Sequence, residues 1–258
     1  MNKILSKMIR HRLFFPLWKK MNELAMYGMN FGVASGYADY SGELYIMRKV
    51  KEIFGNDICI FDIGANIGDW SKFLIQEYQN CSYDLYMFEP SHHAFEQLQK
   101  NIPSAFYHHF FLIGFGDQQG EQILYSDAPA QGSASLLMNS AKYAEKIYID
   151  TIDRFCKEHS IEQIDFLKMD VQGYEYNILQ GAQSMLQEGK IGVIQFEFDA
   201  PNIDNRIFFK DFWELLTPDY DLYHSLYNGL VKIEAYHYTL ENFRCMNYVA
   251  IHKRIRKD

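Results

Sequence analysis

The chain has 258 residues, of which 48% are hydrophobic and 22% charged, a length and composition typical of one sizeable globular α/β domain. Its formal net charge of −8 argues against a protein that binds nucleic acid by neutralising phosphates. No apolar run is long enough to span a bilayer, and the four cysteines form no CxxC pair, so neither a membrane span nor a zinc or dithiol site is expected.

The first twenty residues combine basic and apolar side chains, and no acid precedes Glu23. Two interpretations remain open: a basic amphipathic helix that rests on a membrane surface, or a helix packed on its own domain or on a partner, such as a second copy in a homo-oligomer. Because Pro16 interrupts the segment and its apolar residues are equally suited to docking, we expect packing. We expect a cytoplasmic protein, with peripheral membrane contact through residues 1–20 as the alternative.

Residues 1–55 are predicted to form a helical preface that ends in an amphipathic helix at Glu43–Phe54. From Ile58 onward, short apolar runs alternate with helical stretches, which is the pattern of a parallel sheet. The predicted strands are Ile58–Ile63, Leu85–Phe88, Ala105–Phe115, Ile164–Asp170 and Gly192–Phe198. The predicted helices are Trp70–Glu77, His92–Asn101, Ile152–His159 and Glu175–Leu186.

The rest of the chain departs from this alternation in two places. Residues of about 117–150 are expected to form a hairpin insertion, and a helix near Arg206–Leu216 precedes antiparallel strands at about 220–252. These strands are predicted at Tyr220–Ser225 and Asn247–His252. We therefore predict that residues 56–258 form a single Rossmann-like α/β domain. Its sheet would be mainly parallel and seven-stranded, with an antiparallel edge strand and helices on both faces.

The first predicted strand leads into Gly64-Ala-Asn-Ile-Gly68, and a helix follows. Glycines there allow a sharp turn and a close approach to a ligand. A dinucleotide fingerprint would need glycine where Asn66 and Asp69 stand, and an acid at the helix N-terminus would repel a diphosphate. A P-loop is excluded because no GK[ST] sequence is present. S-adenosylmethionine, an adenosine compound without phosphate and with a positive sulfonium, suits this acidic loop better.

Further acids follow the next predicted strands. Glu89 ends the second strand 21 residues after Gly68, where an acid commonly holds the hydroxyls of a ribose. Asp117 follows the third strand and is expected to contact the adenine ring. The expected cofactor-binding residues are therefore Asp62, Gly64, Asn66, Gly68, Glu89 and Asp117.

Four segments in this order, FDIGANIGDW, FEPS, DFLKMDVQGYEYNILQGA and QFEFD, resemble the FkbM-type methyltransferase family over roughly residues 58–200. The resemblance implies a class I methyltransferase fold, S-adenosylmethionine as methyl donor, and O-methylation. Acceptors in that family are sugar hydroxyls of polysaccharides and glycolipids, or hydroxyls of secondary metabolites. The chain departs from the family at Gln172, where glutamate is common, and glutamine can orient a ligand but cannot accept a proton.

Methylation of a hydroxyl requires a base or a metal close to the donor's methyl group. Lys168, Asp170 and Gln172 alternate along one extended segment, and Glu197 and Asp199 alternate along the next, so each set shares one face. We expect Asp170, Glu197 and Lys168 to act in catalysis, and Gln172 and Asp199 to bind the acceptor. No metal site is assigned; a divalent cation such as Mg²⁺, held by the three carboxylates, is the less favoured alternative.

Two other hypotheses stand beside an O-methyltransferase that acts on a small-molecule or glycan acceptor. A nicotinamide-dependent sugar-nucleotide enzyme is opposed by Asn66, by Asp69 and by the lack of a Tyr-xxx-Lys pair near the fourth strand. A non-catalytic relative that binds S-adenosylmethionine or a partner is left open by Gln172.

Overall fold

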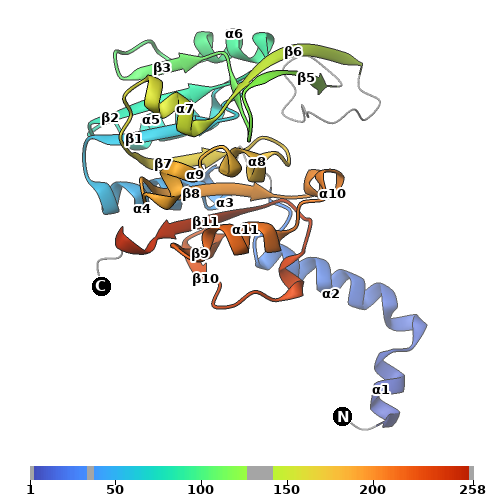
Figure 1. The fold of residues 1–258 in the computed structure, drawn as a ribbon. Coiled ribbons are helices and arrows are strands. Elements are labelled where there is room, and N and C mark those ends of the chain that lie inside the picture. Colours follow the sequence, from blue (N-terminus) through green and yellow to red (C-terminus); the bar gives the residue numbers. More distant parts are fainter. Residues whose placement is uncertain (1–2, 34–37, 127–141, 256–258) are drawn as a thin grey trace.

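The computed structural model describes residues 3–33, 38–126 and 142–255. Its main sheet contains β1 (Ile58–Ile63), β2 (Tyr83–Phe88), β3 (His108–Phe111), β7 (Ile164–Met169), β8 (Ile191–Phe198), β9 (Tyr220–Leu226), β10 (Gly229–Lys232) and β11 (Met246–His252). Among the described residues these eight strands lie in the order β10-β9-β11-β8-β7-β1-β2-β3 (Figure 1). The five strands from β8 to β3 pair in parallel with one another. The remaining pairs, β8 with β11, β11 with β9 and β9 with β10, are antiparallel.

This topology confirms the predicted fold class, a mainly parallel α/β sheet with an antiparallel portion. The described sheet has eight strands where seven were expected, because β10 pairs with β9 and extends the antiparallel edge. Leu226 pairs with Gly229, so only Tyr227 and Asn228 form the turn.

Helices cover both faces of the sheet, and the strand side chains alternate between two apolar clusters. Ile60 packs into one cluster and Phe61 into the other. The first cluster is covered by α4 (Glu43–Phe54), α5 (Asp69–Glu77) and α6 (His92–Asn101). The second cluster is covered by α7 (Ile152–Glu158), α8 (Glu175–Gln180), α9 (Gln183–Gln187) and α11 (Phe209–Leu216).

The prediction of one strand over Ala105–Phe115 is wrong. The chain leaves the main sheet after β3, and Gly114–Phe115 forms β4 in a separate three-stranded sheet of order β4-β6-β5. In that sheet β5 (Gly120–Ser126) pairs antiparallel with β6 (Tyr143–Asp150). The two strands lie in the segment where an insertion was predicted, and the residues between 127 and 141 lie outside the described part of the chain.

Two predicted helices differ from the observed ones. The helix predicted over Glu175–Leu186 divides into α8 and α9 around Gly181, where a Cβ atom would overlap the carbonyl oxygen of Gly116. The helix predicted from Arg206 begins only at Phe209. Arg206 itself has a left-handed backbone, with φ of 55°, and ends the short helix α10 (Pro201–Asn205).

The N-terminal segment forms α1 (Lys3–Ile9), the 3₁₀ turn η1 (Arg12–Phe14) and α2 (Phe15–Gly28), and α3 (Ala38–Ser41) precedes α4. No residue of α2 is fully buried, and of its residues only Met26, near the C-terminal end, packs partly against the domain. Pro16 lies in the first turn of α2 and begins the helix rather than interrupting it. Within the described ranges, no helix is long and apolar enough to cross a membrane.

A buried ion pair joins β1 and β7 at the centre of the main sheet. Asp62 lies directly opposite Lys168 in the parallel register, and Lys168 Nζ is 2.9 Å from Asp62 Oδ1. Ser71, on α5, donates its hydroxyl hydrogen to Asp62 Oδ2 at 2.7 Å. Burial alone would lower the pKa of Lys168, but the charges of Asp62, Asp170 and Glu43 and the hydrogen bond to Asp62 together outweigh it, so the net effect raises this pKa. Lys168 is therefore charged, and its positive charge is paired with the negative charge of Asp62.

This dependence predicts non-additive stability effects. Lys168→Met or Asp62→Leu alone leaves one buried charge unpaired and should lower the free energy of unfolding by about 3–5 kcal/mol. The double variant removes both charges and should be no less stable than either single variant. Urea denaturation of the four proteins measures this. If the losses of the two single variants add in the double variant, the pair does not carry the interaction described.

Candidate active site

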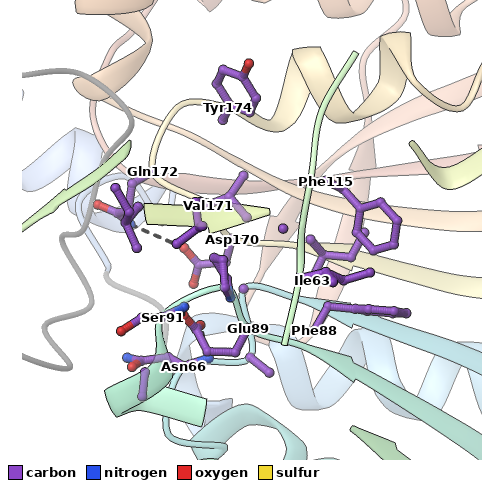
Figure 2. Close-up of a pocket in the computed structure, with 18 of the residues that line it drawn as sticks. Ile63, Asn66, Phe88, Glu89, Ser91, Phe115, Asp170, Val171, Gln172 and Tyr174 are labelled. Atoms are coloured by element: carbon purple, nitrogen blue, oxygen red, sulfur yellow. Dashed lines mark hydrogen bonds between the residues drawn. The ribbon is translucent and has the colours of Figure 1, made fainter. Parts of the chain in front are cut away.

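A cavity of about 300 Å³ lies at the carboxyl ends of β1, β2 and β7. Its walls come from the loops after these strands and from the β5–β6 hairpin. In Figure 2, Asp170, Gln172, Glu89 and Asn66 lie toward one side of the cavity and Phe88 and Phe115 toward the other. The cavity thus has a polar part and an apolar part, at the edge where ligands bind in open α/β sheets.

The glycine loop after β1 lies close to the end of β7. Gly64 has φ of +75°, and a Cβ atom there would overlap the carbonyl oxygen of Asp170. The N–H groups of Gly64 and Ala65 both donate to Phe88 O at 3.0 Å, which ties the loop to β2. Gly64 and Asn66, two of the expected cofactor-binding residues, line the cavity. At Gly64, glycine is required by the approach of two backbone segments.

Glu89, at the end of β2, is the acid best placed to accept hydrogen bonds from the hydroxyl groups of a ligand. Its carboxylate accepts the Asn66 N–H and the Ser91 N–H, each at 2.9 Å, and its side chain lines the cavity. Burial raises the pKa of Glu89 to about 7. Each carboxylate oxygen can accept one more hydrogen bond. The two oxygens therefore form an acceptor pair that matches the adjacent hydroxyls of a ribose.

The apolar part of the cavity fits a flat ring. It is lined by Phe88, Ile113, Phe115, Leu124, Ile147 and Ile149. Three of these residues belong to the β5–β6 hairpin, whose part in the site was not predicted because the sequence does not show where the insertion folds back.

The charge of the lining suits a cation better than a phosphate. Among the described residues that line the cavity, Lys168 is the single Lys or Arg, and its Nζ is bonded to Asp62. The acids in the lining are Glu43, Asp69, Glu89, Glu145 and Asp170. The residues therefore fit the positive sulfonium and uncharged ribose of S-adenosylmethionine, and they offer little to a diphosphate.

Three predicted cofactor residues do not line the cavity. Asp62 is fully buried, and its carboxylate is bonded to Lys168 and Ser71. Gly68 has φ of +89°, and a Cβ atom there would lie 2.8 Å from Leu98 Cδ1, so this glycine serves the packing of α6. Asp117 is exposed, and its carboxylate interacts with the Tyr174 hydroxyl rather than facing the apolar part of the cavity.

The loop after β7 has a constrained backbone. Gln172 has φ of 57° and Gly173 has φ of 91°, so two successive residues adopt the left-handed conformation. Glu175 Oε1 accepts the N–H of Val171 at 2.9 Å and that of Gly173 at 3.3 Å. Asn205, on α10, donates to Gly173 O at 2.6 Å. A left-handed glutamine is uncommon, and the surrounding contacts hold it in place beside the cavity.

Gln172 connects two of the predicted catalytic acids. Its Nε2 donates to Asp170 Oδ1 and to Glu197 Oε2, each at 3.3 Å, and Figure 2 shows the first of these bonds. The Cys245 thiol donates to Glu197 Oε1 at 2.8 Å. Burial and the charge of Asp170 raise the pKa of Glu197 well above its ordinary value. A proton on Glu197 therefore lowers the repulsion between the two carboxyl groups.

Some of the predicted catalytic and acceptor-binding residues line the cavity, and others do not. Lys168, Asp170 and Gln172 line it, whereas Glu197 and Asp199 do not. Burial and the neighbouring Asp170 carboxylate raise the pKa of Asp199 to about 6. In the described part of the chain, no group of three or more His, Cys, Asp or Glu side chains is arranged to hold a metal ion.

Glu43 is a lining residue that the sequence analysis missed. It is the first residue of α4 and is buried. Its carboxylate accepts the Ser41 hydroxyl at 2.9 Å and Gln195 Nε2 at 3.3 Å. The only sequence signal is an acid in the first turn of a helix, which also occurs at many positions of no special function.

Residues 62–222 match the family model described as the methyltransferase FkbM domain. This span contains Gly64, Glu89, the β5–β6 hairpin, Asp170 and Glu197. Among curated proteins, the chain is similar to the 2-O-methyltransferase NoeI of Sinorhizobium fredii. The two are 25% identical over an alignment of 171 positions that covers 59% of this chain and 69% of that protein.

Two solved structures are also similar. The crystal structure of methyltransferase FkbM from Methylobacillus flagellatus KT has a TM-score of 0.47 and 18% identity. That comparison covers 76% of this chain and 44% of the other, so this chain spans less than half the length of that protein. A TehB-like SAM-dependent methyltransferase from Corynebacterium glutamicum has a TM-score of 0.44 and 12% identity, covering 92% of this chain and 97% of the other.

The position of Glu89 predicts how the affinity for S-adenosylhomocysteine depends on pH. A ribose bound at Glu89 would donate its hydroxyl hydrogens to the ionised carboxylate, and the pKa of Glu89 is about 7. The affinity should therefore be highest above pH 7 and fall as the pH drops below it. Glu89→Gln removes one acceptor oxygen and should weaken binding by about 1–3 kcal/mol, with little dependence on pH.

Titration calorimetry between about pH 6 and pH 8 measures both effects. Glu96→Gln, at an exposed position of α6, is the matched control and should behave as the unmodified protein does. Equal affinity of the Glu89→Gln variant and the unmodified protein at every pH would remove Glu89 from the binding site.

Proposed function

This chain belongs to the FkbM family of S-adenosylmethionine-dependent methyltransferases, and we propose that it methylates a hydroxyl oxygen of a sugar-containing small molecule or glycan. The observation that carries the proposal is the Asp170 carboxylate, which lines the cavity at the end of β7 and is bonded to Gln172. The similarity to a 2-O-methyltransferase supports oxygen as the methylated atom.

The cavity residues have separate parts in holding the cofactor. Glu89 accepts the ribose hydroxyls, the apolar residues around Phe115 contact the adenine ring, and the loop from Gly64 to Asn66 faces the amino-acid end. When bound, S-adenosylmethionine supplies an electrophilic methyl group on a sulfonium, which an in-line nucleophile can displace. The protein contributes by positioning the acceptor hydroxyl and by taking its proton.

Asp170 is our candidate for the base, because it is the acid of the Asp170–Gln172–Glu197 group that lines the cavity. Gln172 donates to both acids, so it orients Asp170 without accepting a proton itself. Burial and the Asp170 charge raise the pKa of Glu197, which favours its protonated form and so limits the negative charge beside Asp170. A glutamine at position 172 is compatible with catalysis in this arrangement, since the base is its neighbour.

Lys168 and Asp199 have supporting parts in this proposal. Lys168 is bonded to Asp62 and to Gly64 O, so it positions the glycine loop and takes no part in proton transfer. Asp199 lies close enough to Asp170 for their charges to interact, and we assign it to acceptor binding.

The acceptor class is tested by methyl transfer from isotopically labelled S-adenosylmethionine to a panel of oligosaccharides, glycolipids and nucleotide sugars. We expect label in at least one saccharide, bound to a hydroxyl oxygen when the product is analysed by linkage-sensitive mass spectrometry. Labelling of nitrogen or carbon acceptors in a broader panel, with no saccharide labelled, would contradict the proposal.

Asp170→Asn tests the base. With the cofactor contacts intact, turnover should fall by about 10²–10⁴-fold while the affinity for S-adenosylhomocysteine is unchanged. Asp219→Asn, an exposed substitution outside the lining, is the matched control and should retain full turnover. If Asp170→Asn retains turnover while Glu197→Gln loses it, the base is Glu197 and our assignment is wrong.

A further inference from the structure

The N-terminal arm, defined here as residues 3–28, projects from the body of the protein (Figure 1). Its longer helix, α2, has an apolar stripe of Leu17, Met21 and Leu24, whose spacing places them on one helix face. These side chains are 50%, 52% and 72% exposed. Met26, in contrast, packs partly against the core and accepts a hydrogen bond from Asn242 Nδ2 at 3.2 Å. The stripe is therefore an apolar surface that the described residues of the protein leave uncovered.

The corner between α1 and α2 continues this surface. Trp18 Nε1 donates to Ile9 O at 2.7 Å and so connects the two helices across the turn. Leu13 and Phe15, within the same corner, are 75% and 68% exposed. Because a hydrogen bond fixes the corner, its exposed apolar side chains stay close to one another. They differ in this from exposed apolar residues that are scattered singly over a surface.

The charge of the arm indicates what kind of surface it binds. Six basic residues and no acid precede Glu23. The remainder of the chain has nineteen basic and thirty-three acidic residues, a net charge of −14. Pairing two arms through their stripes would bring two sets of six positive charges together, which is unfavourable. An anionic lipid surface neutralises these charges and also accepts the apolar stripe.

We propose that the N-terminal arm binds the headgroup region of anionic lipid bilayers. The apolar stripe and the corner enter the boundary between headgroups and acyl chains, and the basic residues contact the lipid phosphates. Each basic residue near such a surface strengthens binding by about five-fold. The proposal is independent of the methyl acceptor, since it concerns residues outside the cavity and outside the span that matches the family.

Co-sedimentation of the full chain with vesicles tests the proposal. The unmodified protein should bind vesicles of phosphatidylcholine with about one third phosphatidylglycerol, bind pure phosphatidylcholine much more weakly, and lose affinity at high salt. The triple variant Leu17→Ser, Met21→Ser, Leu24→Ser should bind the anionic vesicles at least about tenfold more weakly. Lys19→Gln with Lys20→Gln should weaken binding by about 25-fold.

The matched control changes three exposed apolar residues of the body, Phe106→Ser, Ile203→Ser and Val231→Ser, and should bind as the unmodified protein does. Because the arm side chains are exposed, the thermal midpoints of the arm variants should equal that of the unmodified protein. Equal vesicle binding by the stripe variant and the unmodified protein would overturn the proposal. A dimer in sedimentation equilibrium that the stripe variant converts to monomer, without vesicle binding, would assign the stripe to a second copy instead.

Discussion

The buried pair of Asp62 and Lys168 is the interaction on which the rest of the site depends. Two charges removed from water are tolerated only when each has close partners, and here the partners come from different elements. Asp62 bonds Lys168 of β7 and Ser71 of α5, and Lys168 also donates to Gly64 O at 3.3 Å. One charge pair therefore fixes the end of β1, the glycine loop, the first helix after it and the end of β7.

This constraint determines where the chemistry is located. Because the glycine loop lies against the Asp170 carbonyl, the loop that follows must turn sharply, and Gln172 does so in a left-handed conformation. The turn directs the Gln172 amide between Asp170 and Glu197. The result is a cavity with acidic walls in which the positive charge of Lys168 is already matched, and such a cavity favours a cationic ligand over a phosphate.

The sequence was sufficient where the signal is local. Strand periodicity, together with the rule that ligands bind at the carboxyl ends of parallel strands, located Gly64, Glu89 and Asp170, and all three line the cavity. It was insufficient where a residue's partner is distant in the chain. That Lys168 is bonded to Asp62, 106 residues away, depends on β7 pairing with β1. That Gln172 bridges two acids depends on β8 lying next to β7, and neither contact has a periodic signature.

The most direct test of the account is a crystal structure of the full chain with S-adenosylhomocysteine. We expect both ribose hydroxyl oxygens within hydrogen-bond distance of the Glu89 carboxylate, about 2.5–3.0 Å, and adenine beside Phe115. We also expect the sulfur to face Asp170, with the ion pair of Asp62 and Lys168 intact. A ligand bound elsewhere, or bound here with Glu89 contacting only the N–H groups of Asn66 and Ser91, would contradict the account.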